Sequence, residues 1–275
     1  MNDAAPEWPA PGIDPDVPSA ARVYDALLGG RDNFKVDRGA AEIFERLSPR
    51  VREAARLNRS ALLRGVRYMV GEGGIGQILD IGCGLPAEEN THEAAQGIDP
   101  DARVVYVDND PMVLSHGRAL LADDRTTTVV TADLRDPSGI LANPDVRAHL
   151  DFDRPVGLVI AGTIMQIAEG ESPDAIIAEL MAPLASGSHL LITAWPDTGE
   201  PAQHGLSRAC LETLGNGWCR PVERLERHFQ GMPMVPPGLE YIPRWHPGEP
   251  DRAVPAVDDL APFERTHMAG IAVKP

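Results

Sequence analysis

The sequence has few cysteines, almost no lysine and no long apolar run. Its three cysteines, Cys83, Cys210 and Cys219, form no Cys-x-x-Cys pair and no zinc-ligand spacing. So few thiols favour a reduced, cytoplasmic setting. No apolar stretch approaches the roughly 20 residues that a membrane span needs. We therefore expect no resident metal and no membrane partner.

Positive charge is also scarce. Lysine and arginine total 25 against 41 acids, which gives a net charge of −16. Such a chain repels nucleic-acid phosphates, so we expect no nucleic-acid partner. Residues 1–17 are acidic and proline-rich and lack the basic flank and apolar core of a secretory signal. They are expected to form a disordered lead-in.

Helical patterns come first along the chain. Three helices are expected, capped by Ser19, Asp37 and Ser48-Pro49 and covering residues 20–28, 37–47 and 48–70. Residues 18–75 are therefore predicted to form an N-terminal helical lid. The remaining residues, 76–275, are predicted to form a second, larger domain.

The larger domain alternates strand and helix patterns. Strands are expected at residues 77–81, 102–107, 126–131, 156–160 and 189–194, with helices between them, including 87–96, 112–121 and 173–184. This alternation predicts an α/β fold with a parallel sheet that helices cover on both faces. The last third is less regular, with helices expected at 206–214 and 221–229 and strands at 238–245 and 266–273.

A glycine turn follows the first expected strand. Gly82-Cys83-Gly84-Leu85-Pro86-Ala87 fits the dinucleotide pattern G-x-G-x-x-G/A. However, Asp80 stands two residues before the first glycine, where a carboxylate would repel a pyrophosphate and attract a cation. The turn therefore favours S-adenosylmethionine, which carries an ammonium and a sulfonium, over a nicotinamide cofactor. Cys83 is interpreted as a small residue that fits the turn.

Acids also follow the next two expected strands. Asp108 ends the second strand, where its carboxylate suits the two hydroxyls of a ribose, although an acid here can also cap the next helix. Asn109 follows it directly. Asp133 comes after the third strand, where it can accept a hydrogen bond from an adenine amino group, and Leu134 is one of the apolar neighbours that can sandwich the ring. Ligands of open α/β sheets bind at these strand ends.

These elements in order resemble the class I S-adenosylmethionine-dependent methyltransferases. Further segments resemble an actinobacterial methyltransferase family once known as a domain of unknown function: residues 18–34, 52–59, 90–93, 105–111, 132–137 and 270–275. The resemblance implies a Rossmann-like, seven-stranded, mostly parallel sheet whose last strand is antiparallel and inserted beside the fifth. We also expect Ala161 in the cofactor site and a lid that contacts the cofactor through Tyr24, Asn33, Phe34 and Arg59. Core packing remains an alternative for Tyr24 and Phe34, and a structural ion pair remains one for Arg59.

The acceptor side is not defined by the sequence. The loops after the fourth and fifth strands lack the histidines expected of such proteins and offer only Gln166 and Asp197 as candidate catalytic residues. The sequence has neither a G-x-S-x-G elbow nor a P-loop. The favoured hypothesis is methyl transfer to a small-molecule acceptor. A non-catalytic S-adenosylmethionine-binding sensor and, more weakly, an NAD-dependent oxidoreductase remain alternatives.

Overall fold

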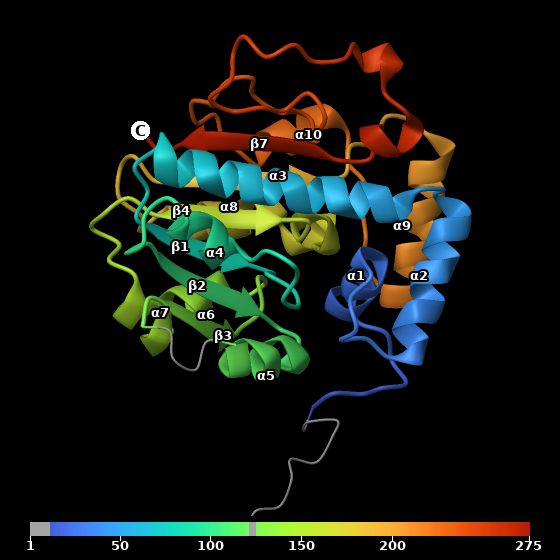
Figure 1. The fold of residues 1–275 in the computed structure, drawn as a ribbon, viewed down its shortest axis with the longest axis horizontal. Helices are drawn as coiled ribbons and strands as arrows, with labels where there is room; N and C mark the ends of the chain where they lie inside the picture. Colours follow the sequence, from blue (N-terminus) through green and yellow to red (C-terminus); the bar gives the residue numbers. More distant parts are fainter. Residues whose placement is uncertain (1–11, 121–124) are drawn as a thin grey trace, which may run out of the picture.

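The computed structural model describes residues 12–120 and 125–275, which form a seven-stranded sheet with helices on both faces (Figure 1). The strands are β1 Gln77–Ile81, β2 Arg103–Asp108, β3 Thr127–Thr131, β4 Gly157–Ala161, β5 His189–Ala194, β6 Glu240–Tyr241 and β7 Met268–Val273. The longer helices are α1 Ala20–Leu28, α2 Lys35–Leu47, α3 Val51–Gly71, α5 Pro111–Leu120, α8 Pro173–Met181 and α9 Pro201–Leu214. Shorter helices are α4 Thr91–Gln96, α6 Pro137–Ala142, α7 Pro144–His149 and α10 Val222–Arg227.

The strand order is β3-β2-β1-β4-β5-β7-β6, and the first five strands run parallel. Strand β7 pairs antiparallel with β5, with Leu190 opposite Ala272, as the resemblance predicted. Every residue of β1 and β5 is buried, because helices cover both faces of the sheet. The parallel arrangement brings the carboxyl ends of β1 to β4 to one edge.

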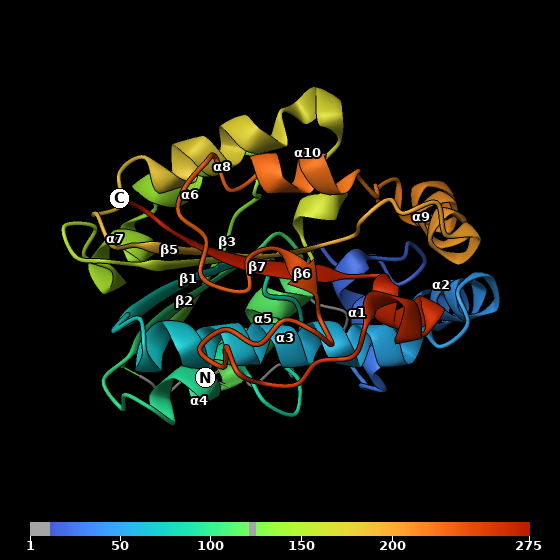
Figure 2. The same cartoon turned by 90° about the horizontal axis from the view of Figure 1, so that it is seen from above.

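Alternate residues of each strand enter two separate hydrophobic cores. Leu79 and Val105 face the core beneath α6, α7, α8 and α10, whereas Ile78 and Val104 face the core beneath α3 and α4. Figure 2 shows these helix layers above and below the sheet. The two-residue period of the strands therefore builds two cores from one run of apolar residues.

A third core lies beyond the carboxyl ends of the strands. It joins α1, α2 and the start of α3 to α9, with Val23, Phe44, Val51 and Leu206 among its buried members. Figure 1 shows α1, α2 and α9 together at this end of the sheet. The C-terminal half of α3 packs on the sheet instead. The cover over the strand ends is thus made by α1, α2, α9 and only the first turns of α3.

The predicted starts of the second and third helices were displaced. Helix α2 begins at Lys35 rather than after Asp37, because the Asp37 carboxylate reaches back and accepts the Phe34 backbone N–H at 2.7 Å. The third helix begins at Val51 rather than at Ser48-Pro49, since Ser48 still closes the last turn of α2 through its N–H to Phe44. Capping contacts, which a sequence pattern places poorly, decide both ends.

Helix α4 and strand β6 are much shorter than predicted. Helix α4 begins at Thr91 rather than at residue 87, because Asn90 and Glu93 form a capping box that starts it there. The strand expected over 238–245 is reduced to Glu240–Tyr241, and a turn follows it.

Residues 1–11 of the predicted lead-in lie outside the described residues. Within the described part, Ile13 is buried and belongs to a small cluster with Leu85 and Met112. No helix among the described residues is long and apolar enough to cross a bilayer.

Candidate functional site

A cavity of about 190 Å³ opens at the carboxyl ends of β1 to β4, beneath α1 and α9. Twelve residues predicted for the site line it: Tyr24, Arg59, Asp80, Gly82, Cys83, Gly84, Asp108, Asn109, Asp133, Leu134, Ala161 and Gln166. They come from the N-terminal helices, from the carboxyl ends of β1, β2 and β4, and from the turns that follow the first four strands. The topology therefore gathers residues that are up to 142 positions apart, from Tyr24 to Gln166.

Asp80 is buried on β1, where its Oδ2 accepts a hydrogen bond from the Thr91 hydroxyl at 2.7 Å. Burial raises the pKa of this carboxyl to about 6, although the Thr91 hydrogen bond and the nearby Arg59 guanidinium partly offset the effect. A buried carboxylate in this position gains most from a cationic ligand, because the cation replaces the water that burial removed.

The glycine turn has the backbone that its sequence predicts. Gly82 and Gly84 have φ angles of 72° and 70°, a region that favours glycine. A Cβ at Gly82 would lie 2.3 Å from Oγ1 of Thr163, whereas one at Gly84 would meet no atom within 4 Å. Cys83 lies between these two glycines, and burial raises the pKa of its thiol well above the usual value. The thiol is therefore protonated, which agrees with the interpretation of Cys83 as a small residue rather than a nucleophile.

The Asp108 carboxylate holds the turns on either side of it. Its Oδ2 accepts the Gly84 backbone N–H at 2.8 Å, and its Oδ1 accepts the Asp110 N–H at 3.0 Å. Burial raises the pKa of Asp108. Each carboxylate oxygen retains a second lone pair for a ligand hydroxyl. Asp110 takes the alternative role of helix cap, because its Oδ1 accepts the Met112 N–H at 2.8 Å.

Asp133 lies beside Asn109 and Arg135 at the cavity rim. The Asn109 amide donates to its Oδ2 and the Arg135 backbone N–H donates to its Oδ1, both at 2.8 Å. Partial burial raises the pKa of Asp133, but these hydrogen bonds outweigh burial and the pKa lies below its usual value. Asp133 is therefore an ionised hydrogen-bond acceptor near neutral pH.

Arg59 reaches the cavity from α3. Its Nη2 donates to the backbone oxygen of Glu89 at 2.6 Å, whereas its Nε is buried and has no hydrogen-bond partner among the described residues. An unsatisfied buried donor on a guanidinium is costly, and a ligand carboxylate would satisfy it.

Hydrogen bonds join the helical cover to the sheet. The Tyr24 hydroxyl donates to the Ala55 backbone oxygen at 2.9 Å and accepts from the Asn58 amide at 3.1 Å. The Asn58 Oδ1 in turn accepts from the Thr193 hydroxyl on β5 at 2.6 Å. Tyr24 therefore has a structural partner as well as a place in the cavity wall.

Three predicted site residues are not among those that line the cavity, and their roles stay predictions. Asn33 donates to the Asp25 carboxylate at 2.7 Å, in the loop after α1. Phe34 packs beneath the Arg22 guanidinium, 5.0 Å from its ring centre. Asp197 pairs with His204 at 2.7 Å outside the cavity. Each of the three thus has a hydrogen bond or packing contact outside the cavity lining.

The apolar end of the cavity was not predicted from the sequence. Eight residues from α1, α2, α3, α9 and the end of β5 form this apolar end: Val23, Leu27, Phe44, Val51, Trp195, Leu206, Cys210 and Leu214. Helical periodicity marks most of them as buried, but no local pattern distinguishes core packing from a cavity wall.

His267 also borders this end. Its Nε2 accepts from the Trp195 indole N–H at 2.8 Å, so its Nδ1 carries the proton and donates to the Thr266 hydroxyl at 2.9 Å. Burial lowers its pKa to about 3. His267 is therefore a neutral imidazole with both nitrogens engaged.

The fold and the acidic strand ends define a class I methyltransferase architecture. The structure of human N-acetylserotonin methyltransferase in complex with S-adenosylmethionine is similar in fold, with a TM-score of 0.50 and 13% identity over 91% of this chain and 62% of that one. Residues 6–275 match the family described as S-adenosyl methyltransferase, and the chain belongs to this family. S-adenosylmethionine is the cofactor of this family, which removes the oxidoreductase alternative.

Two solved structures are similar over nearly the whole chain. An inferred methyltransferase from Thermobifida fusca is 49% identical, with a TM-score of 0.92 over 97% of this chain and 98% of that one. A DUF574 family protein from Streptomyces avermitilis is 33% identical, with a TM-score of 0.88 over 95% of this chain and 99% of that one. No curated protein matches the sequence.

Proposed function

We propose that this methyltransferase transfers a methyl group directly from S-adenosylmethionine to a small, apolar, uncharged acceptor. The supporting observation is that one cavity joins the acidic strand ends to the apolar end. A charged cofactor and an apolar acceptor can therefore meet within one cavity.

The residues present fit the cofactor at the acidic strand ends. Asp80 would bind its ammonium, and the unpartnered Nε of Arg59 would bind its carboxylate. The turn from Gly82 to Gly84 gives the close backbone approach that the ligand needs. Asp108 would bind the ribose hydroxyls and Asp133 the adenine amino group. Leu134 and Ala161 would supply apolar contacts to the adenine ring.

Bound S-adenosylmethionine supplies a methyl group already activated on a sulfonium. The contribution of the chain is then mainly to align the acceptor and to exclude water, and positioning alone can supply up to roughly 7–11 kcal/mol. Helices α1, α2 and α9 would serve as the cover that keeps water out. We therefore extend the proposed lid from the N-terminal helices to α9.

The apolar end offers no ready general base among its described residues. Burial raises the pKa of the Cys210 thiol to about 12, so it remains protonated. Both nitrogens of His267 are engaged. An acceptor with a free lone pair near neutral pH, such as a neutral amine, needs no base and fits this environment best. Gln166 lines the cavity and is the candidate that would orient it.

The test is turnover with a panel of apolar amines, phenols and carboxylates, followed as formation of S-adenosylhomocysteine. We expect the neutral amines to be methylated and the carboxylates to be rejected. Leu206→Asn at the apolar end should raise the KM for the acceptor by about tenfold, because burying an amide against an apolar ligand costs about 1–3 kcal/mol. The matched control is Leu47→Asn at an exposed leucine of α2, which should leave the KM unchanged.

The alternative of a non-catalytic sensor has one observation in its favour, the missing base. It predicts cofactor binding without turnover across the whole panel. That result would contradict the proposed transfer while leaving the cofactor site intact. Preferential methylation of carboxylates would contradict the acceptor class alone.

A further inference from the structure

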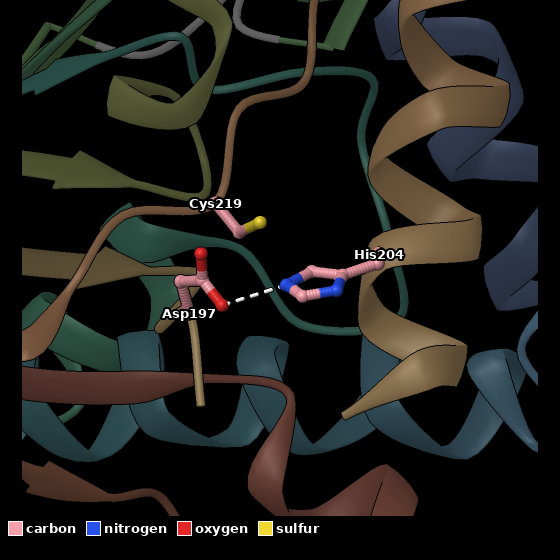
Figure 3. Close-up of side chains that lie close together, drawn as sticks. All are labelled: Asp197, His204 and Cys219. Atoms are coloured by element: carbon pink, nitrogen blue, oxygen red, sulfur yellow. Dashed lines mark hydrogen bonds and ion pairs between the residues drawn. The ribbon is translucent and has the colours of Figure 1, made fainter. Parts of the chain in front are cut away.

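A second group of reactive side chains lies outside the cavity, on three separate segments within residues 197–219. Asp197 follows β5, His204 lies in the first turns of α9, and Cys219 precedes α10. One ligand atom from each side chain lies within 4.8 Å of the other two. Figure 3 shows the thiol and the imidazole converging on the Asp197 carboxylate.

Backbone pairing fixes two of these side chains relative to each other. The Asp197 N–H donates to the Arg220 backbone oxygen at 2.7 Å, and the Arg220 N–H donates to the Trp195 oxygen at 3.0 Å. Pro196 and Arg220 form an isolated parallel bridge. The segments that carry Asp197 and Cys219 are therefore held side by side before any ligand binds.

The third side chain, that of His204, approaches Asp197 from helix α9. The His204 Nε2 lies 2.7 Å from Oδ1 of Asp197, which also accepts the Gly199 backbone N–H at 3.2 Å. A catalytic Cys–His–Asp triad would need the two imidazole nitrogens to face different partners. Here a carboxylate oxygen, a ring nitrogen and a sulfur lie within 4.8 Å of one another, which is close enough for all three to bind one metal ion.

We propose that Asp197, His204 and Cys219 bind one zinc-type divalent cation, with a fourth position open to water. Zinc accepts sulfur, imidazole and carboxylate ligands together, whereas magnesium and calcium require oxygen ligands. On binding, the cation takes the place of the proton between His204 and Asp197. The Cys219 thiol loses its proton to solvent as the sulfur–metal bond forms.

The cation would tie α9 to the segment that follows β5. Leu206, Cys210 and Leu214 of the same helix form part of the apolar end of the cavity. A metal bound at the start of α9 would therefore restrain one wall of the space proposed for the acceptor. The site itself does not depend on that proposal, since none of its three ligands lines the cavity.

Calorimetric titration of the untagged full-length chain with zinc chloride tests the site. We expect about one zinc ion per chain, and at least about a tenfold loss of affinity in His204→Ala and in Cys219→Ser, since each removes one of three ligands. The matched control is His149→Ala on α7, which should bind zinc like the wild type. Circular dichroism and thermal unfolding of each metal-free variant establish that it folds.

A second measurement identifies the sulfur ligand without a variant. Cobalt bound in place of zinc should show a thiolate-to-metal charge-transfer absorption, and zinc should protect Cys219 from alkylation, as mapped by mass spectrometry. Magnesium should do neither. Equal zinc affinity in the wild type and Cys219→Ser, an adventitious ion only, would overturn the proposal, as would alkylation of Cys219 at the same rate with and without zinc. These measurements need no S-adenosylmethionine, so their failure is separate from any failure of methyl transfer.

Discussion

The hydroxyl of Thr91, the first residue of α4, donates a hydrogen bond to the buried Asp80 carboxylate of β1 at 2.7 Å. This hydrogen bond stabilises the ionised acid, yet burial outweighs it and raises the pKa of Asp80 to about 6. The charge that we expect the cofactor ammonium to need is therefore lost just below neutral pH.

Affinity for S-adenosylmethionine is accordingly expected to fall as the pH drops through about 6, where Asp80 becomes protonated. Asp80→Asn should weaken binding by about 10- to 100-fold at neutral pH, since a charge-assisted hydrogen bond contributes roughly 1.5–3 kcal/mol. It should also remove most of this pH dependence. Calorimetry across the pH range measures both effects.

Asp80→Asn should change folding stability and cofactor affinity in opposite directions, so the stability measurement serves as a control for the affinity measurement. A carboxyl with a folded-state pKa of about 6 and an ordinary value of 3.8 binds more protons in the folded state between these values. The contribution of Asp80 to the stability of the apoprotein should therefore be lost as the pH rises through that window, so Asp80→Asn should gain stability relative to the wild type over it. Asp101→Asn, at an exposed acid, should behave like the wild type in both assays. An Asp80→Asn protein that retains full affinity would contradict the ammonium role.

Asp108→Ala should reduce cofactor affinity by about 100-fold, which corresponds to about 3 kcal/mol for lost hydrogen bonds to the ribose hydroxyls. The carboxylate also holds the Gly84 and Asp110 backbone N–H groups, so the variant should be less stable as well. Chemical unfolding measures the second effect separately. Unchanged affinity in the folded variant would rule out the ribose role.

The two turn glycines should respond differently to a methyl group. Gly82→Ala combines positive-φ strain with a Cβ only 2.3 Å from the Thr163 hydroxyl oxygen, whereas Gly84→Ala adds strain alone. We expect a loss of about 1–2 kcal/mol in unfolding free energy for Gly84→Ala and about 3 kcal/mol or more for Gly82→Ala. Urea unfolding compares the two. Equal losses would show that Thr163 moves aside freely.

His267 should make the protein sensitive to acid. Its folded-state pKa is about 3 against an ordinary 6.5, so its contribution is complete above pH 6.5 and lost as the pH falls toward 3. The shift corresponds to about 5 kcal/mol over that range. His267→Gln should flatten the pH profile of unfolding free energy, whereas His149→Gln should not. Parallel profiles for His267→Gln and the wild type would contradict this prediction.

The acidic half of the site was predictable because each signal is local. Asp80, Asp108 and Asp133 each stand near the end of an apolar run, and a parallel sheet collects such ends at one edge. The contacts of Asn33 and Phe34 were not predictable, because the chain reversal after α1 brings them beside Asp25 and Arg22, and no local pattern marks such pairings. The predicted starts of α2, α3 and α4 were wrong because individual capping contacts decide them. At the start of α2, for example, the Asp37 carboxylate accepts the Phe34 backbone N–H.

The sequence by itself determined the alternation of strands and helices, the glycine turn and the acids beside it, because periodicity and backbone preference act over a few residues. Only the tertiary structure decided which side chains form the apolar end of the cavity and which reactive side chains come together outside it. Helix α9 closes the apolar end against Val23 and Phe44, and His204 approaches Asp197 and Cys219. These contacts depend on how distant segments pack, which local sequence patterns do not encode.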